Sequence, residues 1–397
     1  MLKEKNVVLA VTGSIAAYKI VNLARMLKKL GCNVDVLMTK NATQFISPLT
    51  FESLLGTKCL IDTFDRNFQY SVEHVAIAKK ADVVLCAPAS ANVIGKIASG
   101  IADDMLTTTI MACPCKKIIA PAMNHNMYHN PIVQDNIEKL KKFGYEIINP
   151  ETGMLANGDM GDGRMPDEEV LFEHILKEIA FTKDLLGKKV LITAGATRES
   201  LDPVRFITNH SSGKMGYALA KAAIRRGADV TVISAHTDEK APMFAKNINV
   251  VSADDMFNAV NDNKENADII IMAAAVSDYT PENTSKEKIK KTDDDLSIKL
   301  KRTKDILKHL GENKKEGQVI IGFAMETENL IENAAKKLQR KNCDMICANN
   351  LKTEGAGFGT DTNVVTIITE KETKTLEKMS KDEVAHKIFD EIKNIIK

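Results

Sequence analysis

The sequence predicts an α/β protein built from two doubly wound parallel sheets that follow one another along the chain. Three observations support this prediction. Short apolar runs alternate with segments of helical periodicity, as expected of parallel strands covered on both faces. The alternation stops near residue 185 and starts again at Val190. With 397 residues, the chain is also too long for one ordinary core, so we expect domains at 1–185 and 186–397.

The first half begins with a buried strand over residues 7–12, which Gly13 interrupts. Apolar residues then recur at helical spacing from Ile20 until Gly31 ends the helix. The glycine- and charge-rich stretch 153–167 is typical of a functional loop or flap rather than of sheet. Further strands are expected at 34–38, 83–87, 118–120 and 145–148.

The second half has the same architecture but shares no repeated motif with the first. The segment 170–189 is expected to be a helix that leads into a linker, and another helix is expected over 215–226. Segments 364–369 and 373–377 could pair as a hairpin before a terminal amphipathic helix. Strands are expected at 190–194, 230–234, 269–273, 319–323 and 345–348.

Composition narrows the functional classes. Hydrophobic residues make up 44% and charged residues 27%, which is normal for a globular domain. A net charge of +1 gives no field that would recruit nucleic acid or an anionic membrane. The start resembles no signal peptide, and no apolar run is long enough for a membrane span. The seven scattered cysteines include only a CPC at Cys113 and Cys115, so we expect reduced thiols, no zinc site and a cytoplasmic protein.

Small and polar residues cluster where the strands of the first half end, which is where open parallel sheets bind ligands. Backbone N–H groups at Gly13 and Ser14 could hold a phosphate, although such a pair after a strand is more often only a turn. The absence of GxGxxG makes a nicotinamide cofactor less probable. Small residues at successive strand ends leave room for a flat ring with polar edges.

Six segments together resemble the bifunctional phosphopantothenoylcysteine decarboxylase/phosphopantothenate–cysteine ligase family. They are GSIAAYK, MTKNATQFI, SVEHVAIAKKAD, PASANVIGKIASGIADD, PAMNHNMY and LANGDMGDGRM, and they span most of residues 6–170. The resemblance implies a flavodoxin-like domain in which His74 is the catalytic base and Asn124 grips the substrate carboxylate. It assigns FMN to Gly13, Ser14, Ile15, Thr39, Ser90, Ala91 and Asn92.

The chemistry of that family suits these residue types. A cysteinyl carboxylate loses CO₂ slowly because the carbanion has no electron sink, and oxidation by FMN to a thioaldehyde supplies one. A histidine that titrates near neutrality suits proton removal, although His74 taken alone fits a surface histidine at a helix end better. An amide such as Asn124 binds a carboxylate without a strong charge pairing that would oppose CO₂ loss.

The flap departs from the family pattern at one position. Many relatives carry a cysteine there that protonates the enethiol product, whereas this chain has Asn157. A carboxamide is not a useful acid near neutral pH, while a thiol with a pKa near ~8.5 is. Asp159, a water or another flap residue could donate instead, or the product could stall in its oxidised form. We expect an active enzyme with a substitute donor.

The second half carries a different set of strand-end motifs. They are TAGATRE, DPVR, NHSSGKMG, AAAVSDY, KEKIKK and GFAMET, and none has the Walker spacing of a P-loop. We expect residues 209–216 to open a helix whose donors could face an anion, although SSGKMG is also an ordinary serine-capped helix start. The lysine run taken alone is most simply a solvated loop.

These motifs resemble the ligase half of the same family through most of residues 188–360. The resemblance implies a Rossmann-like domain that uses CTP and Mg²⁺ to join 4'-phosphopantothenate to cysteine through an acyl-cytidylate. It assigns Asn209 to the acyl intermediate and Lys288 to the phosphates, where charge neutralisation is needed. It assigns CTP to Ala273, Ala274, Ala275, Asp278, Lys288, Asp305, Ile306, Phe323, Lys337 and Lys341, and it leaves the metal ligands unassigned.

The resemblance also implies a homo-oligomer, with a trimeric decarboxylase half that forms a dodecamer and a dimeric ligase half. The segment GKIASGIADDMLTTT matches the contacts of that family, and its Ala98, Gly100 and Ala102 permit close approach. Two alternatives remain. The first is a ligase whose flavin-bearing half is impaired at Asn157. The second is a flavoprotein that regulates a partner, whose expected loss of His74 or Asn124 is not seen in the sequence.

Overall fold

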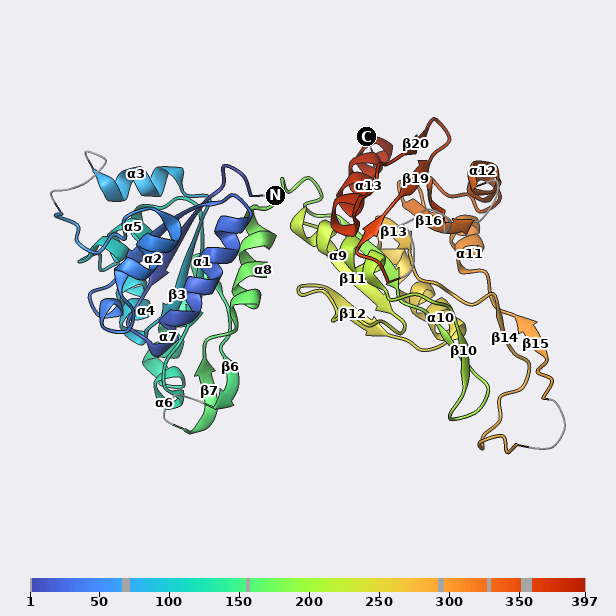
Figure 1. Ribbon diagram of the computed structural model, residues 1–397, viewed down its shortest axis with the longest axis horizontal. Coiled ribbons are helices and arrows are strands. Elements are labelled where there is room, and N and C mark those ends of the chain that lie inside the picture. Colours follow the sequence, from blue (N-terminus) through green and yellow to red (C-terminus); the bar gives the residue numbers. More distant parts are fainter. Residues whose placement is uncertain are drawn as a thin grey trace. The chain divides into compact units, whose positions relative to one another are not determined.

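The computed structural model describes residues 2–65, 72–154, 158–291, 296–326, 330–350 and 359–396. The chain divides into two compact units, Met1–Phe181 and Thr182–Lys397. Each unit holds a sheet with helices on both faces (Figure 1). The prediction of two doubly wound parallel sheets is therefore confirmed. No helix among the described residues is both long and apolar enough to cross a bilayer.

The first unit contains a five-stranded parallel sheet in the order β2-β1-β3-β4-β5. Its strands are β1 (Asn6–Val11), β2 (Asn33–Met38), β3 (Val83–Ala89), β4 (Lys116–Pro121) and β5 (Glu146–Ile147). Its helices are η1 (Ile15–Tyr18), α1 (Lys19–Lys29), η2 (Ala42–Gln44), α2 (Pro48–Leu55), α3 (Glu73–Lys80), α4 (Ala91–Ala98), α5 (Met105–Ala112), α6 (His125–Tyr128), α7 (Pro131–Lys142) and α8 (Glu168–Ile179). All four strands predicted after the first lie within a residue or two of these bounds.

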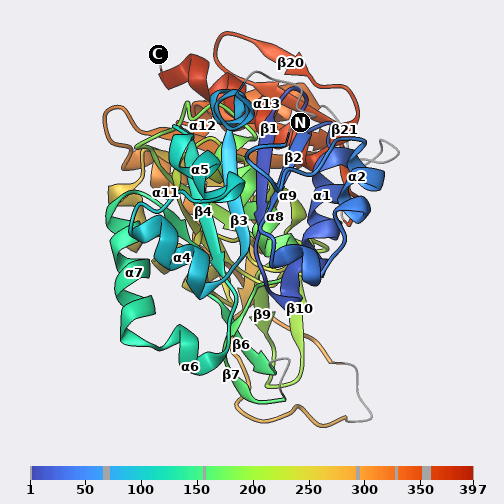
Figure 2. The same cartoon turned by 90° about the vertical axis from the view of Figure 1, so that its left-hand side faces the viewer.

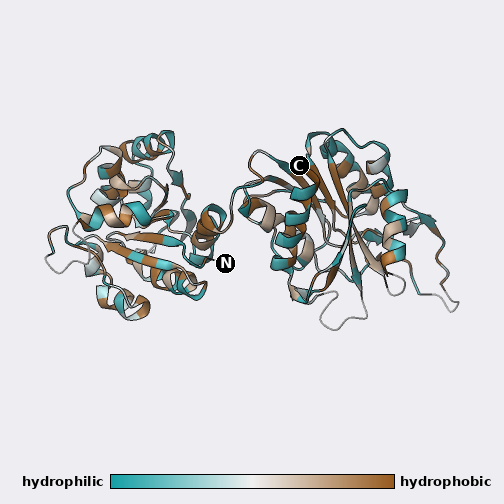
Figure 3. Ribbon diagram, turned by 90° about the horizontal axis from the view of Figure 1, so that it is seen from above, coloured by the Kyte–Doolittle hydropathy of each residue, from teal (hydrophilic) through white to brown (hydrophobic). Residues whose placement is uncertain are grey.

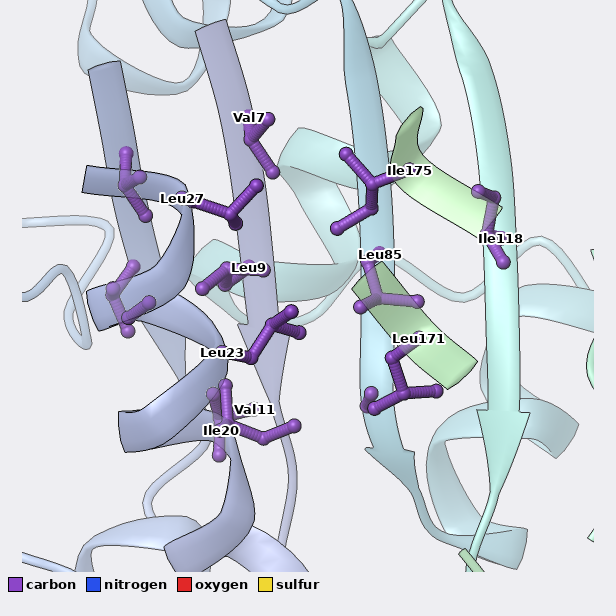
Figure 4. Close-up of a cluster of buried hydrophobic side chains, with 14 of the residues drawn as sticks. Val7, Leu9, Val11, Ile20, Leu23, Leu27, Leu85, Ile118, Leu171 and Ile175 are labelled. Atoms are coloured by element: carbon purple, nitrogen blue, oxygen red, sulfur yellow. The ribbon is translucent and has the colours of Figure 1, made fainter. Parts of the chain in front are cut away.

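Apolar layers on both faces hold this sheet. On one face, side chains of β1 pack against Ile20, Leu23 and Leu27 of α1, all fully buried (Figure 4). Leu171 and Ile175 of α8 cover the same face beside β3. Full burial of one such aliphatic side chain contributes about 1.5–3 kcal/mol, so these layers fix the strands against their helices.

An antiparallel hairpin of β6 (Glu151–Met154) and β7 (Met160–Arg164) follows β5, and we call it the flap hairpin. The expectation of a loop rather than sheet was therefore wrong for this segment. Its strands carry glycines at 153, 161 and 163, so the sequence lacks the alternating apolar pattern that signals a strand. Figure 2 shows the flap hairpin beside α6 at one end of the unit.

The second unit contains an eight-stranded sheet in the order β12-β11-β8-β13-β16-β17-β19-β20. The first six strands in this order are parallel, and β19 and β20 form the predicted hairpin. Its strands are β8 (Lys189–Ala194), β11 (Asp229–Ser234), β12 (Lys246–Asn249), β13 (Ile269–Met272), β16 (Val319–Glu326), β17 (Met345–Asn350), β19 (Val365–Ile368) and β20 (Thr373–Thr375). Its helices are α9 (Lys214–Arg225), α10 (Ala253–Asn263), η3 (Lys264–Asn266), α11 (Ile306–Glu312), α12 (Leu330–Arg340) and α13 (Lys381–Ile396).

Three short hairpins surround the second sheet. They pair β9 (Arg198–Ser200) with β10 (Phe206–Thr208), β14 (Tyr279–Pro281) with β15 (Leu300–Arg302), and β18 (Thr362–Asn363) with β21 (Met379–Ser380). In each unit the apolar residues concentrate on the strands and on the helix faces turned toward them (Figure 3).

Helix α13 packs on α9 and contacts residues near the start of the second unit. Phe389 and Ile392 of α13 are fully buried. Asp184, near the start of the unit, accepts a hydrogen bond at 2.6 Å from Arg226 and pairs with Lys393 of α13 at 2.9 Å. The core of this unit is therefore completed by α13.

Candidate active sites

The first candidate site lies at the carboxyl ends of β1 and β3. From β1 the chain runs to β2 on one side and then crosses to β3 on the other side of β1. The loops after β1 and β3 therefore diverge, and such a switch point leaves a crevice for a ligand at the sheet edge. Ser14 follows β1 and Ser90 follows β3, so both predicted serines lie at this edge.

Thr12 joins the two strand ends. Its buried hydroxyl donates to the carbonyl oxygen of Pro88 at 2.7 Å and accepts from the N–H of Ser90 at 2.9 Å. From the sequence alone, Thr12 is only the end of a strand. A hydroxyl at the last position of an otherwise apolar strand is the signal that could have identified it.

Both predicted serines begin helices. The Oγ atom of Ser14 accepts from the N–H of Ala16 at 3.4 Å, and that of Ser90 accepts from Val93 at 3.4 Å. The first amides of a helix have no acceptor within it, so the amides at Ile15, Ala91 and Asn92 are positioned to bind an anion at this edge.

The neighbouring loops pack closely around this edge. A Cβ atom at Gly13 would lie 2.7 Å from Cβ of Asn41, so only glycine fits between the loops after β1 and β2. Thr39 stabilises the second loop, because its Oγ1 atom accepts from the N–H of Ala42 at 3.1 Å. The predicted FMN residues thus gather on three adjacent loops.

Asn124 lies at the same edge after β4, where the flap hairpin contacts it. The N–H of Met123 donates to the carbonyl oxygen of Gly163 at 3.1 Å. A Cβ atom at Gly163 would lie 2.2 Å from the Met123 oxygen, so the contact requires glycine. The Oδ1 atom of Asn124 accepts from Asn126 at 2.9 Å, which leaves its Nδ2 group to donate to a ligand. Asn157 lies outside the described residues.

The structure does not bring His74 to this edge of its own chain. His74 is the second residue of α3, which ends near Asp82, and Asp82 accepts from the first residue of β1 at 2.8 Å. The eight-residue α3 is only about 12 Å long, whereas the seven-residue β3 spans about 23 Å. Helix α3 is therefore too short to carry His74 to the carboxyl ends of the strands. Figure 1 accordingly shows α3 at the end of the unit opposite α6 and the flap hairpin.

The second candidate site is a cavity of about 780 Å³ at the carboxyl ends of β13 and β16. The six parallel strands have the order 3-2-1-4-5-6 of a dinucleotide fold, whose switch point lies between β8 and β13. Every predicted CTP residue except Lys288 lines the cavity, and so does Asn209. The described lining residues include seven cationic side chains and only two carboxylates, so the cavity favours a polyanion.

Two buried threonines shape the loop after β13. The Oγ1 atom of Thr193 accepts from the N–H of Ala274 at 3.1 Å, and that of Thr197 accepts from Ser277 at 3.0 Å. Both threonines are fully buried. Thr193 lies near the end of β8, and Thr197 lies in the loop after it. They orient the backbone of Ala273–Ala275 toward the cavity, a role that the motif TAGATRE does not by itself reveal.

Asp305 and Lys341 form an ion pair in the wall of the cavity, in which the Lys341 side chain is buried and that of Asp305 is 48% exposed. Burial alone would raise the pKa of Asp305, but the Lys341 ammonium and the N–H of Lys308 outweigh it and hold this pKa below its usual value. Lys337 donates to the carbonyl oxygen of Phe323 at 2.9 Å, which fixes it across the end of β16.

Lys288 is exposed and lies on a loop that two other residues hold. Asp202 accepts from the N–H of Ile289 at 3.1 Å, and Arg205 donates to the carbonyl oxygen of Ile289 at 2.6 Å. Burial would raise the pKa of Asp202, but the surrounding amides and the Arg205 guanidinium hold it well below its usual range. The position next to Lys288 is therefore fixed by an ionised carboxylate and its arginine.

The helix predicted over 215–226 is confirmed to within one residue, whereas the expectation that it opens over 209–216 was wrong for residues 209–213. Helix α9 begins at Lys214, and Gly213 precedes it with a φ of 79°. A Cβ atom at Gly213 would lie 2.5 Å from Thr237, so the chain turns here through a conformation that favours glycine. Asn209 instead donates from Nδ2 to the carbonyl oxygen of Ala275 at 3.3 Å.

Two family models match the chain. One, described as the DNA/pantothenate metabolism flavoprotein C-terminal domain, covers residues 185–396, and the other, described as Flavoprotein, covers residues 1–180. The coenzyme A biosynthesis bifunctional protein CoaBC of Bacillus subtilis is 48% identical over 396 residues, which is 99% of this chain and 97% of that protein.

The protein of the same name from Haemophilus influenzae is 41% identical over 391 residues, with 98% of each chain covered. A crystal structure of the C-terminal domain of a coenzyme A biosynthesis bifunctional protein CoaBC is 42% identical. It covers 54% of this chain and 98% of that domain, with a TM-score of 0.47.

Proposed function

The chain belongs to the family of coenzyme A biosynthesis bifunctional proteins, and we propose on this basis that its two units catalyse consecutive reactions. The second unit ligates 4'-phosphopantothenate to cysteine. The first unit then decarboxylates 4'-phospho-N-pantothenoylcysteine to 4'-phosphopantetheine. The observation that carries this proposal is that the relatives match both units along 98–99% of the chain, while each unit has its own strand-end site.

The carboxyl edge of the first sheet suits FMN. Serine-capped helix starts after β1 and β3 direct free amides to one place, where a phosphate binds well. Close loop packing at Gly13 leaves a narrow edge against which a flat ring can lie. Bound FMN would supply the oxidation of the cysteine side chain that gives CO₂ loss its electron sink.

The residues of this chain bind and orient the substrate. Asn124 offers its Nδ2 group to the carboxylate and is held in place by its own Oδ1 contact. The flap hairpin reaches the backbone beside Asn124 and excludes water from that side. His74 accepts the proton that leaves when the substrate is oxidised.

His74 performs this role for a neighbouring copy of the chain. It lies at the amino end of its own sheet, whereas Ser14, Ser90 and Asn124 lie at the carboxyl end. A second chain must then present its His74 to the first chain's flavin edge. Exposed apolar side chains around that edge, Ile15, Tyr18, Phe45 and Leu49, are between 51% and 64% exposed and suit such a contact. The trimers and dodecamers expected from the family would provide it.

The cavity of the second unit suits a nucleoside triphosphate. Its cations neutralise the phosphates, Lys337 and Lys341 among them, and Lys288 approaches from its tethered loop. Asp278 contacts the ribose or cytosine, and Phe323 packs against the nucleotide. Because Asp305 is already paired with Lys341, Mg²⁺ is held mainly by the phosphates and water, as is usual for this ion.

The test is to incubate the full chain with 4'-phosphopantothenate, cysteine, CTP and Mg²⁺ and to weigh the products. We expect the cysteine adduct to form first and CO₂ to be lost only while the protein retains its flavin. With ATP in place of CTP, the first step should slow. A protein that makes no adduct with either nucleotide would contradict the ligase assignment, and one that takes up no FMN would contradict the decarboxylase assignment.

A further inference from the structure

Two histidines and an aspartate converge where the flap hairpin meets α6. His125 is the first residue of α6 and His129 caps its end, so the two lie four residues apart on one helical face. Asp162 lies on β7 and faces them. Ligand atoms of the three side chains all lie within 4.8 Å of one another, and among the described residues this is the one group of three that does so. We propose that His125, His129 and Asp162 bind a divalent transition metal ion such as Zn²⁺.

Two of the three ligand atoms already have nearly the separation that two ligands of one metal ion have. The Nε2 atom of His129 lies 3.0 Å from Oδ2 of Asp162. Two ligand atoms around a tetrahedral zinc ion, each bonded at about 2.0–2.1 Å, stand roughly 3.3 Å apart. The ligand atom of His125 lies within 4.8 Å of the other two, so a rotation of this side chain would bring it to the ion.

The surroundings orient the ligands as in protein metal sites. Thr152 donates from its hydroxyl to Oδ1 of Asp162, which leaves Oδ2 free to turn toward His129 and an ion. The N–H of Asp162 donates to Nδ1 of His125 at 3.1 Å. Metal binding exchanges this hydrogen bond for a bond to the ion, and Nε2 of His129 gives up its hydrogen to Nδ1 or to solvent.

The donor set selects the class of ion. Two imidazole nitrogens and one carboxylate oxygen suit Zn²⁺, Co²⁺, Ni²⁺ or Cu²⁺, whereas Mg²⁺ and Ca²⁺ prefer oxygen alone. The His129 and Asp162 side chains are 48% and 35% exposed, so water completes the coordination and the ion exchanges with solvent. A bound ion joins β7 to the segment that carries Asn124, and its binding depends on neither flavin nor substrate.

Cobalt titration of the full, untagged chain after removal of metals by a chelator tests this site. We expect one Co²⁺ per chain to bind, with visible d–d bands on the long-wavelength side of the flavin absorption. Zn²⁺ should displace these bands. The variants H129N and D162N, each checked for native circular dichroism, should bind at least about tenfold more weakly, since loss of an outer-shell partner alone costs that much.

His236 provides the matched control, because it also faces a carboxylate, Asp238 at 3.6 Å, but is not in a described group of three. The H236N variant should bind Co²⁺ like the unchanged chain. A second readout is protease resistance of the flap hairpin, which Zn²⁺ should raise in the unchanged chain and not in D162N. Absence of saturable binding, or equal binding by H129N, D162N and H236N, would show that the three side chains form only a hydrogen-bonded contact.

Discussion

Arg205 donates a hydrogen bond at 2.6 Å to the carbonyl oxygen of Ile289, a residue 84 positions further along the chain. Asp202 accepts from the N–H of the same residue, so both polar groups of one backbone position are held from a single turn. The residue before it is Lys288, which the proposed ligase reaction requires near the phosphates. The turn at 202–205 therefore positions Lys288 by holding the backbone of the next residue.

Replacing Asp202 by Asn should slow the ligase reaction by roughly 10- to 100-fold, as expected when a charged group is misplaced by about 1 Å. We expect kcat to fall more than KM rises, because the nucleotide cavity itself is unchanged. Glu282→Gln, which removes a surface partner of Lys299 on the neighbouring hairpin, is the matched control. Equal rates for both variants would rule out a positioning role for Asp202.

Lys288→Gln should reduce formation of the acyl-cytidylate by about two to three orders of magnitude, since a preorganised charge is lost. Lys286→Gln, in the same exposed run, should have little effect. Asn209→Ala should let the acyl-nucleotide form but impair its use, and mass analysis of the quenched reaction distinguishes the two. If Lys288→Gln matched Lys286→Gln, the run would be only a solvated loop.

Mixed oligomers test the shared decarboxylase site. His74→Asn and Asn124→Ala should each be inactive when pure, because every site then lacks one group. Co-expressed in equal amounts, they should regain about a quarter of the activity, the fraction of sites that combine an intact His74 from one chain with an intact Asn124 from another. No recovery in a verified mixed oligomer would place both residues in one chain's own site.

The product of the decarboxylase half should be saturated 4'-phosphopantetheine, formed with a proton donor other than Asn157. Mass spectrometry decides, because a stalled product is two hydrogens lighter. Asn157→Cys should keep or increase the saturated fraction, since a thiol with a pKa near ~8.5 is a competent acid. A lighter product from the unchanged chain, restored by Asn157→Cys, would show that no substitute donor exists.

His386 should make the second unit sensitive to mild acid. Burial and the neighbouring Arg225 and Arg226 lower its pKa to about 4, while the unfolded chain titrates near 6.5. As the pH falls, His386 is therefore protonated in the unfolded state before it is protonated in the folded state. The free energy of unfolding is highest above pH 6.5 and decreases as the pH falls toward 4. We expect a loss of roughly 1–2 kcal/mol between pH 7 and 5, after allowance for solvent screening.

Hydrogen exchange of the amides of α9 and α13 in the full chain measures this loss. His386→Leu removes the titrating group at a buried position, so its exchange should depend less on pH over the same range. The His236→Asn variant, altered at an exposed histidine, should keep the dependence of the unchanged chain. A pH dependence that survives His386→Leu would assign the effect to another group.

The central strands could be predicted because burial on both faces demands long apolar runs, as in residues 190–194 and 269–272. The hairpins β9–β10 and β14–β15 could not, because each strand has three residues and seven of the twelve positions are exposed. The helix predicted over 215–226 matches α9 to within one residue, but residues 209–213 are not helical, because the cap is Gly213, whose backbone and not its side chain sets the boundary.

The residues of the candidate sites divide in the same way. Ser14, Ser90 and Asn124 follow strands directly, so the strand pattern alone brings them to one edge. Thr12, Thr193 and Thr197 act on amides about 80 residues away, and no local pattern shows such partners. The resemblance groups His74 with the residues at the carboxyl edge of the sheet. Its position in the folded unit depends instead on how α3 lies relative to the sheet.

The pairing of Asp184 with Arg226 and with Lys393 of α13 affects the order in which the two units can fold during translation. The first unit is complete in sequence at Phe181 and can fold while translation continues. The second unit lacks α13 until residues 381–396 leave the ribosome, so its apolar α9 face stays uncovered until then. A nascent chain arrested before residue 381 should hold a finished flavin domain attached to an unfinished ligase domain, and chaperones would engage the second of these.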